Sequence, residues 1–87
     1  MARVFFQPQL RDLTRGETEV EIAASTLRQL VAELERRFPG LEKRIVRDDR
    51  IAPGMAVSID GVVTSRGLLA PIGAESEVHF LPAIGGG

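Results

Sequence analysis

The residues with the clearest potential for chemistry close this chain, where Gly85, Gly86 and Gly87 follow an apolar run over residues 78–82. Glycine has no side chain, so other backbones can approach such a segment closely. The only reactive group it presents is a main-chain carboxylate, which has an ordinary pKa of about 3.3–3.7 and is an anion near neutral pH. This anion repels nucleophiles until it is converted to a mixed anhydride. We therefore expect Gly87 to be the reactive position, activated by another protein.

Residues 83–87 are expected to form a flexible tail behind a folded body at residues 1–82. Fully extended at about 3.3–3.6 Å per residue, this tail spans roughly 17 Å, enough to reach into a partner's active site. Fixing it costs about 1–2 kcal/mol of backbone entropy per residue, so the tail alone should bind poorly. The body is therefore expected to supply a docking surface, and Gly85 and Gly86 to be recognised in the channel.

The rest of the chain offers little other chemistry. It has no Cys and one His, His79, so neither a thiolate nucleophile nor a metal site is expected. The carboxylates of Asp48, Asp49, Glu75 and Glu77 are interpreted as solvated charge. The glycines are no phosphate-binding loop, because no helix follows them. We expect no stably bound cofactor and no enzymatic activity of the chain by itself.

Composition limits the partners. The 87 residues suit one domain, and 44% hydrophobic with 26% charged residues is ordinary for a globular protein. Eleven basic against twelve acidic residues, with no Trp or Tyr, favour no nucleic-acid partner. No apolar run reaches transmembrane or signal-peptide length, so no membrane association and a cytoplasmic location are expected.

The hydrophobic pattern predicts one helix and several strands. Residues 3–7 and 17–23 are expected to pair as a hairpin, since the second run alternates with period two. Over residues 26–38 the apolar side chains form a single helical stripe. Ser25 or Thr26 caps this helix, Thr26 and Gln29 have capping-box spacing, and Pro39-Gly40 ends it.

Residues 41–54 predict an irregular connector, because charged residues and a Pro53-Gly54 turn interrupt the few apolar ones. Residues 55–59 and 62–64 form a strand pair around the turn residues Asp60-Gly61. Residues 67–73 predict a semi-buried loop, and residues 77–81 the last strand. The fold class is therefore α+β, with a small mixed sheet of four to five strands covered by one main helix. The core facing that helix is expected to contain Val4, Phe6, Val20, Ile22, Val57, Ile59, Val78 and Phe80, with Ile72 closing its edge.

This order of elements, ending in glycines, resembles the ubiquitin-like β-grasp sulfur-carrier proteins (ThiS/MoaD-like). These include the small subunit of molybdopterin synthase and carriers of thiamine and cysteine biosynthesis. The resemblance covers essentially the whole chain. It rests on residues 4–6 with 10–13, residues 26–30 and 38–41, and the run 76–87, in which Glu77-Val78 is followed by Phe80, Pro82 and the glycines. The connector at residues 47–54 is longer than in the shortest carriers, and a third glycine precedes the usual pair.

The resemblance implies that an E1-like enzyme uses ATP to adenylate the carboxylate of Gly87, and that sulfur then replaces the adenylate to give a thiocarboxylate. A larger biosynthetic enzyme would accept the sulfur. For the docking surface, alternation places Phe5, Val63 and Leu81 on the outer side of the sheet, and we predict that they bind the partner.

Two alternatives stay open. In the first, the activated tail is joined to lysines of other proteins, as in ubiquitin-like modifiers. In the second, the chain is a non-covalent interaction module and its tail is incidental. Deleting Gly86 and Gly87 separates the second from both covalent functions.

Overall fold

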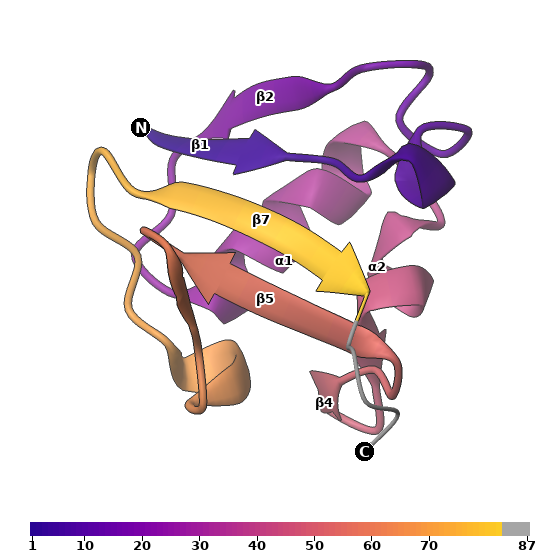
Figure 1. Ribbon diagram of the computed structural model, residues 1–87. Coiled ribbons are helices and arrows are strands. Elements are labelled where there is room, and N and C mark those ends of the chain that lie inside the picture. Colours follow the sequence, from indigo (N-terminus) through magenta and orange to yellow (C-terminus); the bar gives the residue numbers. More distant parts are fainter. Residues whose placement is uncertain (83–87) are drawn as a thin grey trace.

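A computed structural model, which describes residues 1–82, contains a five-stranded sheet with its helices on one side (Figure 1). The sheet order is β2-β1-β7-β5-β6. The strands are β1 (Ala2–Phe5), β2 (Glu19–Ile22), β5 (Met55–Ile59), β6 (Val62–Val63) and β7 (Glu77–Pro82). β1 runs parallel to β7 and the other neighbours are antiparallel, which confirms the predicted mixed sheet and α+β class.

Helix α1 (Leu27–Arg37) packs its apolar stripe on the inner face of the sheet. Within the predicted core, Val20 and Ile59 are half-buried against the rest, and the other members are buried. Phe6 and Phe38 meet edge to face, with ring centroids 5.7 Å apart. The buried stripe residues of the helix are Leu27, Leu30, Val31 and Leu34.

Both ends of α1 follow the predicted signals. The side chain of Thr26 accepts a hydrogen bond from the Gln29 amide at 3.2 Å, as an N-cap does. The Gln29 side chain does not complete a capping box, in which it would accept a hydrogen bond from the Thr26 amide. Its Oε1 instead accepts from the amide and hydroxyl of the preceding residue, Ser25, at 2.9 and 2.7 Å. At the other end Gly40 has φ 99°, a conformation that favours glycine.

The predicted irregular connector at residues 41–54 was wrong. It contains α2 (Leu41–Ile45), β3 (Val46–Arg47) and β4 (Arg50–Ile51), the last two paired as a small hairpin. Leu41 and Ile45, one helical turn apart, are fully buried. Asp48 and Asp49 have φ 54° and 62°, the positive values of a two-residue type I′ turn. The acidic dipeptide, interpreted as solvated charge, is thus also a turn.

An ion pair ties this hairpin to α1. The Arg28 guanidinium donates to Asp49 Oδ1 at 2.7 Å. That hydrogen bond and the accompanying charge attraction lower the pKa of Asp49 and raise the pKa of Arg28. Both groups are exposed, so the contact orients the hairpin more than it stabilises the fold.

Two other segments match their predictions. Asp60 and Gly61 form the tight turn between β5 and β6 with φ 53° and 86°. The loop over residues 67–73 contains the 3-10 turn η2 (Gly67–Leu69) and is semi-buried, since Leu68 and Ile72 are buried and Leu69 is exposed. The polar stretch before β2 contains a second 3-10 turn, η1 (Pro8–Leu10), whose Leu10 belongs to the core. No helix within residues 1–82 is long and apolar enough to span a membrane.

Candidate functional site

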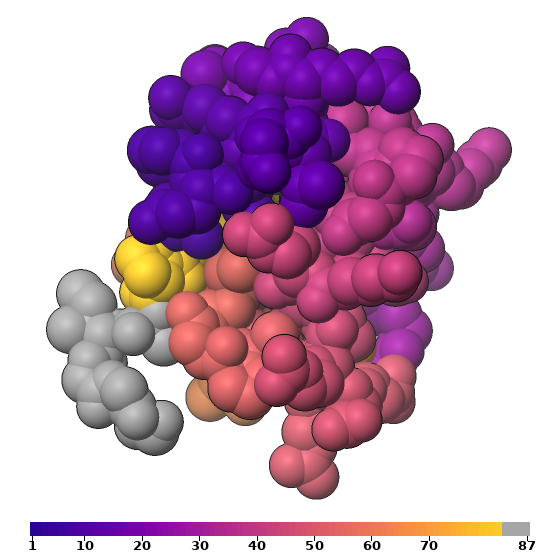
Figure 2. Space-filling view, turned by 90° about the vertical axis from the view of Figure 1, so that its right-hand side faces the viewer, coloured from indigo at the N-terminus to yellow at the C-terminus, as the bar shows by residue number. Residues whose placement is uncertain are grey.

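The central strand β7 carries the chain toward the glycines. It lies between β1 and β5, and its last residue, Pro82, is opposite Met55. Figure 2 shows the end of β7 (yellow) at the surface, between the indigo N-terminal segment and the orange-red segment that leads into β5. The predicted reactive and recognition residues Gly85, Gly86 and Gly87 lie outside the described residues.

Beside this exit, one row of side chains crosses the outer face of the sheet. The strand registers place Phe5 opposite His79, His79 opposite Ser58, and Ser58 opposite Val63. Leu81 lies two residues beyond His79 on β7, opposite Ala56. Because side chains two residues apart on a strand share a face, the three predicted docking residues lie on the same outer face.

We call this set the outer-face patch: Phe5, Ala56, Ser58, Val63, His79 and Leu81. Phe5, His79 and Leu81 are half-buried, and Val63 is 59% exposed. Ser58 is only 7% exposed although it points outward, so its neighbours cover it. The described helices all lie on the opposite side of the sheet, which leaves the patch uncovered within residues 1–82 (Figure 1).

His79 is a member of the patch that was not among the predicted docking residues. Its ring stacks on Phe5, with centroids 4.5 Å apart and planes 9° from parallel. Alternation places His79 outward, but its position between Phe5 and Ser58 depends on the parallel pairing of β1 with β7, strands far apart in sequence. The pairing of distant strands was therefore the missing signal.

The patch has a charged border toward β2. Arg3 lies opposite Glu21 on one side and Glu77 on the other, and its Nε is 3.6 Å from the carboxylate of Glu19. Both side chains of that pair are about half exposed, so it contributes little to stability. The outer face is thus apolar near the exit of β7 and acidic near β2.

A polar network holds the start of β7. The carboxylate of Asp60 accepts from the Glu77 amide at 2.9 Å and from the Ser76 hydroxyl at 3.1 Å. Ser76 Oγ in turn accepts from the Gly73 amide at 2.8 Å. The turn after β5 thereby fixes the entry of β7, and with it the position of the patch.

Within residues 1–82 the outer face of the sheet is an uncovered and partly apolar surface. The described residues bring no three His, Asp or Glu side chains together as a metal site would. What the arrangement can do is present one face of a rigid sheet to another protein while the chain continues from Pro82.

Comparison with known proteins agrees with this description. A family model described as the ThiS family matches residues 4–87. The chain belongs to the ThiS family. It is therefore a ubiquitin-like β-grasp protein of the sulfur-carrier family, as its sequence predicts, and the match extends through the terminal glycines. A search of curated protein sequences found no match.

Solved structures share the fold of this ThiS-family chain. A chain in the BexX/CysO complex of Amycolatopsis orientalis is 27% identical, with a TM-score of 0.92 and 100% of both chains covered. CysO of Mycobacterium tuberculosis is 22% identical, with a TM-score of 0.89 and coverage of 97% of this chain and 100% of that one. SAMP1 of Haloferax volcanii is 21% identical, with a TM-score of 0.73 and coverage of 99% and 98%. The latter two likenesses concern the fold alone.

Proposed function

We propose that this protein is a sulfur carrier whose carboxylate at Gly87 is adenylated and then converted to a thiocarboxylate. In the first step a carboxylate oxygen attacks the α-phosphorus of ATP, which forms the acyl adenylate and releases pyrophosphate. In the second step hydrosulfide, or a sulfur donor that delivers it, displaces AMP at the carbonyl carbon. The product carries one sulfur in place of one oxygen.

The observation that carries this proposal is the ThiS-family match over residues 4–87, which includes the glycines at the reactive end. The physical argument agrees with it. A carboxylate resists nucleophilic attack until its oxygen is made a leaving group, and the described residues supply neither a cysteine thiol nor a cluster of metal-binding side chains. The protein acts in this scheme as a carried substrate and not as an enzyme.

The outer-face patch is the proposed docking surface. It lies on β7 and its neighbours, so a partner bound to it would be close to Pro82, the residue from which the chain continues toward the glycines. Phe5, Val63 and Leu81 provide its apolar contacts, and His79 adds aromatic area between Phe5 and Ser58. An E1-like adenylating enzyme and a larger sulfur-accepting enzyme would use this surface in turn.

ATP is consumed in the active site of the adenylating partner, and we propose no cofactor bound by the carrier itself. The sulfur acceptor belongs to the biosynthesis of a cofactor or an amino acid, for example a pterin precursor, a thiazole or an activated serine. The larger partner enzyme determines which acceptor receives the sulfur.

Intact-mass spectrometry tests the proposal. The full chain is incubated with its adenylating enzyme, ATP and a sulfur donor, and the expected product is heavier by one oxygen-to-sulfur exchange located on Gly87. A chain lacking Gly86 and Gly87 is the control and should stay unmodified while its unfolding midpoint is retained. Unchanged mass of the full chain in a reaction that modifies a known substrate of the same enzyme would contradict the proposal.

A ubiquitin-like modifier is the second candidate, favoured by the fold that this chain shares with a small archaeal modifier protein. The same adenylate would then be attacked by a lysine amine to form an isopeptide bond. Conjugates of higher mass on a blot from the native cell, absent when Gly87 is deleted, would support modification. A thiocarboxylate without conjugates would support sulfur transport.

A further inference from the structure

The open edge of the sheet at β2 is a second binding feature, separate from the outer-face patch. In the order β2-β1-β7-β5-β6, β2 is an end strand, and two strands lie between it and β5. The other end strand, β6, has two residues only, whereas β2 has four. β2 is therefore the longer edge at which a further strand could pair.

The ladder shows which backbone groups point out of this edge. The Phe6 amide donates to the Thr18 carbonyl at 3.0 Å, so Phe6 and Thr18 form a hydrogen-bonded pair. Bonded and non-bonded pairs alternate along antiparallel strands, which turns the N–H and C=O groups of Val20 toward β1. The N–H and C=O groups of Glu19 and Glu21 therefore point away from the sheet, where a new strand would meet them.

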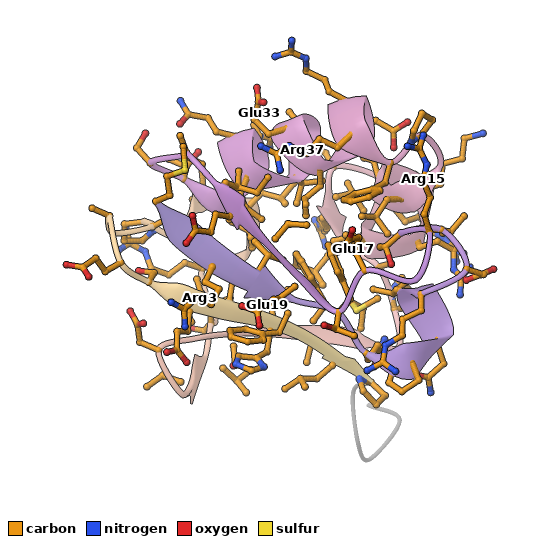
Figure 3. All side chains as sticks on the ribbon, turned by 90° about the horizontal axis from the view of Figure 1, so that it is seen from above. Arg3, Arg15, Glu17, Glu19, Glu33 and Arg37 are labelled. Carbon is orange, nitrogen blue, oxygen red and sulfur yellow. The ribbon has the colours of Figure 1, made fainter. Side chains whose placement is uncertain are left out.

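The carboxylates of β2 lie on the outer side of this edge, and two arginines lie on its other side. Figure 3 looks onto the edge: Arg3 and Glu19 lie together on the outer side of β2, whereas Arg37 comes from α1 and Arg15 from the segment before β2. Glu19 and Glu21 share the outer side, since they alternate with the inward Val20.

A groove of about 850 Å³ follows the same edge. Its lining consists of the apolar residues Met1, Val20 and Phe38 and of charged residues of both signs, Arg15, Arg37, Glu17, Glu19 and Glu21. Neither arginine forms an ion pair or side-chain hydrogen bond with any of residues 1–82. The groove thus has apolar residues beside two arginines that form no ion pair within residues 1–82, although the carboxylate of Glu17 lines the groove with them.

We propose that an extended segment of another protein adds to β2 as a sixth strand, antiparallel, with basic side chains on one face. Antiparallel pairing lets the residues opposite Glu21 and Glu19 exchange both backbone hydrogen bonds with them. Those two residues face the carboxylates and are Lys or Arg. The residue between them faces Val20 and is apolar, and the next one faces the groove near the arginines and is Asp or Glu.

A second copy of this chain does not fit the edge. Two β2 strands paired about Val20 would place Glu19 of one copy directly opposite Glu21 of the other, and like charges in that arrangement destabilise a sheet. Acidic side chains on a short edge strand protect it from self-association. The same carboxylates favour a partner strand with basic side chains, so the edge is selective for the charge of the strand that pairs with it.

Nuclear magnetic resonance of the 15N-labelled full chain tests the proposal. The probe is a short capped peptide with Lys-Val-Lys-Glu at its centre, titrated to millimolar concentration. The expected result is a shift of the Glu19 and Glu21 amide signals together with slower hydrogen exchange of those amides. The charge-reversed peptide Glu-Val-Glu-Lys should bind far more weakly.

Two controls separate strand addition from simple charge attraction. A peptide with the same side chains but N-methyl groups on both Lys amides should lose binding, because it cannot donate to the edge. Glu21→Lys should weaken the original peptide about five-fold, the change that one strong cross-strand charge pair produces, whereas Glu75→Lys, the same substitution in a loop, should leave affinity unchanged.

Each remaining outcome decides against the proposal. Equal binding of the N-methylated peptide, equal effects of the two Lys variants, shifts centred on Phe5 and His79, or no shift at all would overturn it. No adenylating enzyme is involved, so the result is independent of the sulfur-carrier proposal.

Discussion

The rings of Phe5 and His79 lie stacked across two parallel strands, with centroids 4.5 Å apart and planes 9° from parallel. Phe5 ends β1 near the N-terminus, and His79 is in the last strand, so the contact joins the two ends of the described chain. The stack also forms the centre of the outer-face patch. It therefore links the stability of the sheet to the surface that we propose for docking.

A double-mutant cycle measures this contact. Phe5→Leu, His79→Thr and the double variant are unfolded in urea, and the coupling free energy between the two positions is expected to be about 1 kcal/mol, as for aromatic pairs in other proteins. Each single variant should remain folded, because the core residues Val4 and Val78 beside them are unchanged. A coupling free energy near zero would show that the rings touch without stabilising each other.

Val62 and Val63 provide a matched pair for testing the docking surface. Both are exposed residues of β6, but Val63 lies opposite Ser58 on the outer face, whereas Val62 lies opposite Ile59 and points to the other side. We expect Val63→Lys to raise the KM of the adenylating enzyme for the carrier about ten-fold, since a desolvated contact residue contributes more than 1 kcal/mol. Val62→Lys should leave KM nearly unchanged.

Unfolding midpoints of the two variants serve as the control, and they should be similar because both side chains are solvent-exposed. Equal KM values for the two Lys variants would exclude Val63 from the interface. Steady-state pyrophosphate release with the purified adenylating enzyme supplies the measurement.

The side chain of Thr26 is expected to contribute to stability as the N-cap of α1. Thr26→Ala removes the acceptor for the Gln29 amide at the start of α1, and such losses cost about 0.5–2 kcal/mol. Thr26→Asp restores an acceptor and should recover most of the lost stability. The backbone bridge between Thr26 and Pro71 is retained in both variants, so urea unfolding of the two isolates the cap. Equal stability of the Ala and Asp variants would contradict the capping role.

The sequence predicted local elements well because their signals are local. Period-two alternation located the strands, and the stripe from Leu27 to Leu34 located the helix with its Thr26 cap. The outward positions of Phe5 and Leu81 followed from the same alternation.

The features that the sequence did not predict all depend on contacts between residues far apart in the chain. In residues 41–54 only Leu41 and Ile45 are fully buried, and two apolar positions are too few to indicate a helix. The start of α2 is stabilised by a hydrogen bond to Glu35, which belongs to the preceding helix. The stack of His79 on Phe5 and the open edge at β2 follow from strand order, which local periodicity does not determine.

The contact of Glu35 with α2 makes stability depend on pH. Its carboxylate, near the end of α1, accepts from the Gly40 amide at 3.0 Å and from the Glu42 amide at 2.8 Å. These backbone hydrogen bonds, Gly40 first, lower the pKa of Glu35 below its ordinary value. The folded state thus favours the charged carboxylate, so the contribution to stability is present above the unfolded-state pKa, about 4.3, and is lost as pH falls through the lower folded-state pKa.

We therefore expect Glu35→Gln to lower the unfolding temperature at pH 7 and to lose this effect in acid. The difference between wild type and variant should shrink as pH falls below about 4.3, because the protonated carboxyl and the amide are then equally neutral acceptors. Glu33→Gln is the matched control: Glu33 lies on the same helix but contacts Arg36 at the surface, where an exposed ion pair contributes little. Thermal unfolding of the three proteins across this pH range is the measurement. A Glu35→Gln difference that stayed constant with pH would assign the effect to packing and not to the charge at the start of α2.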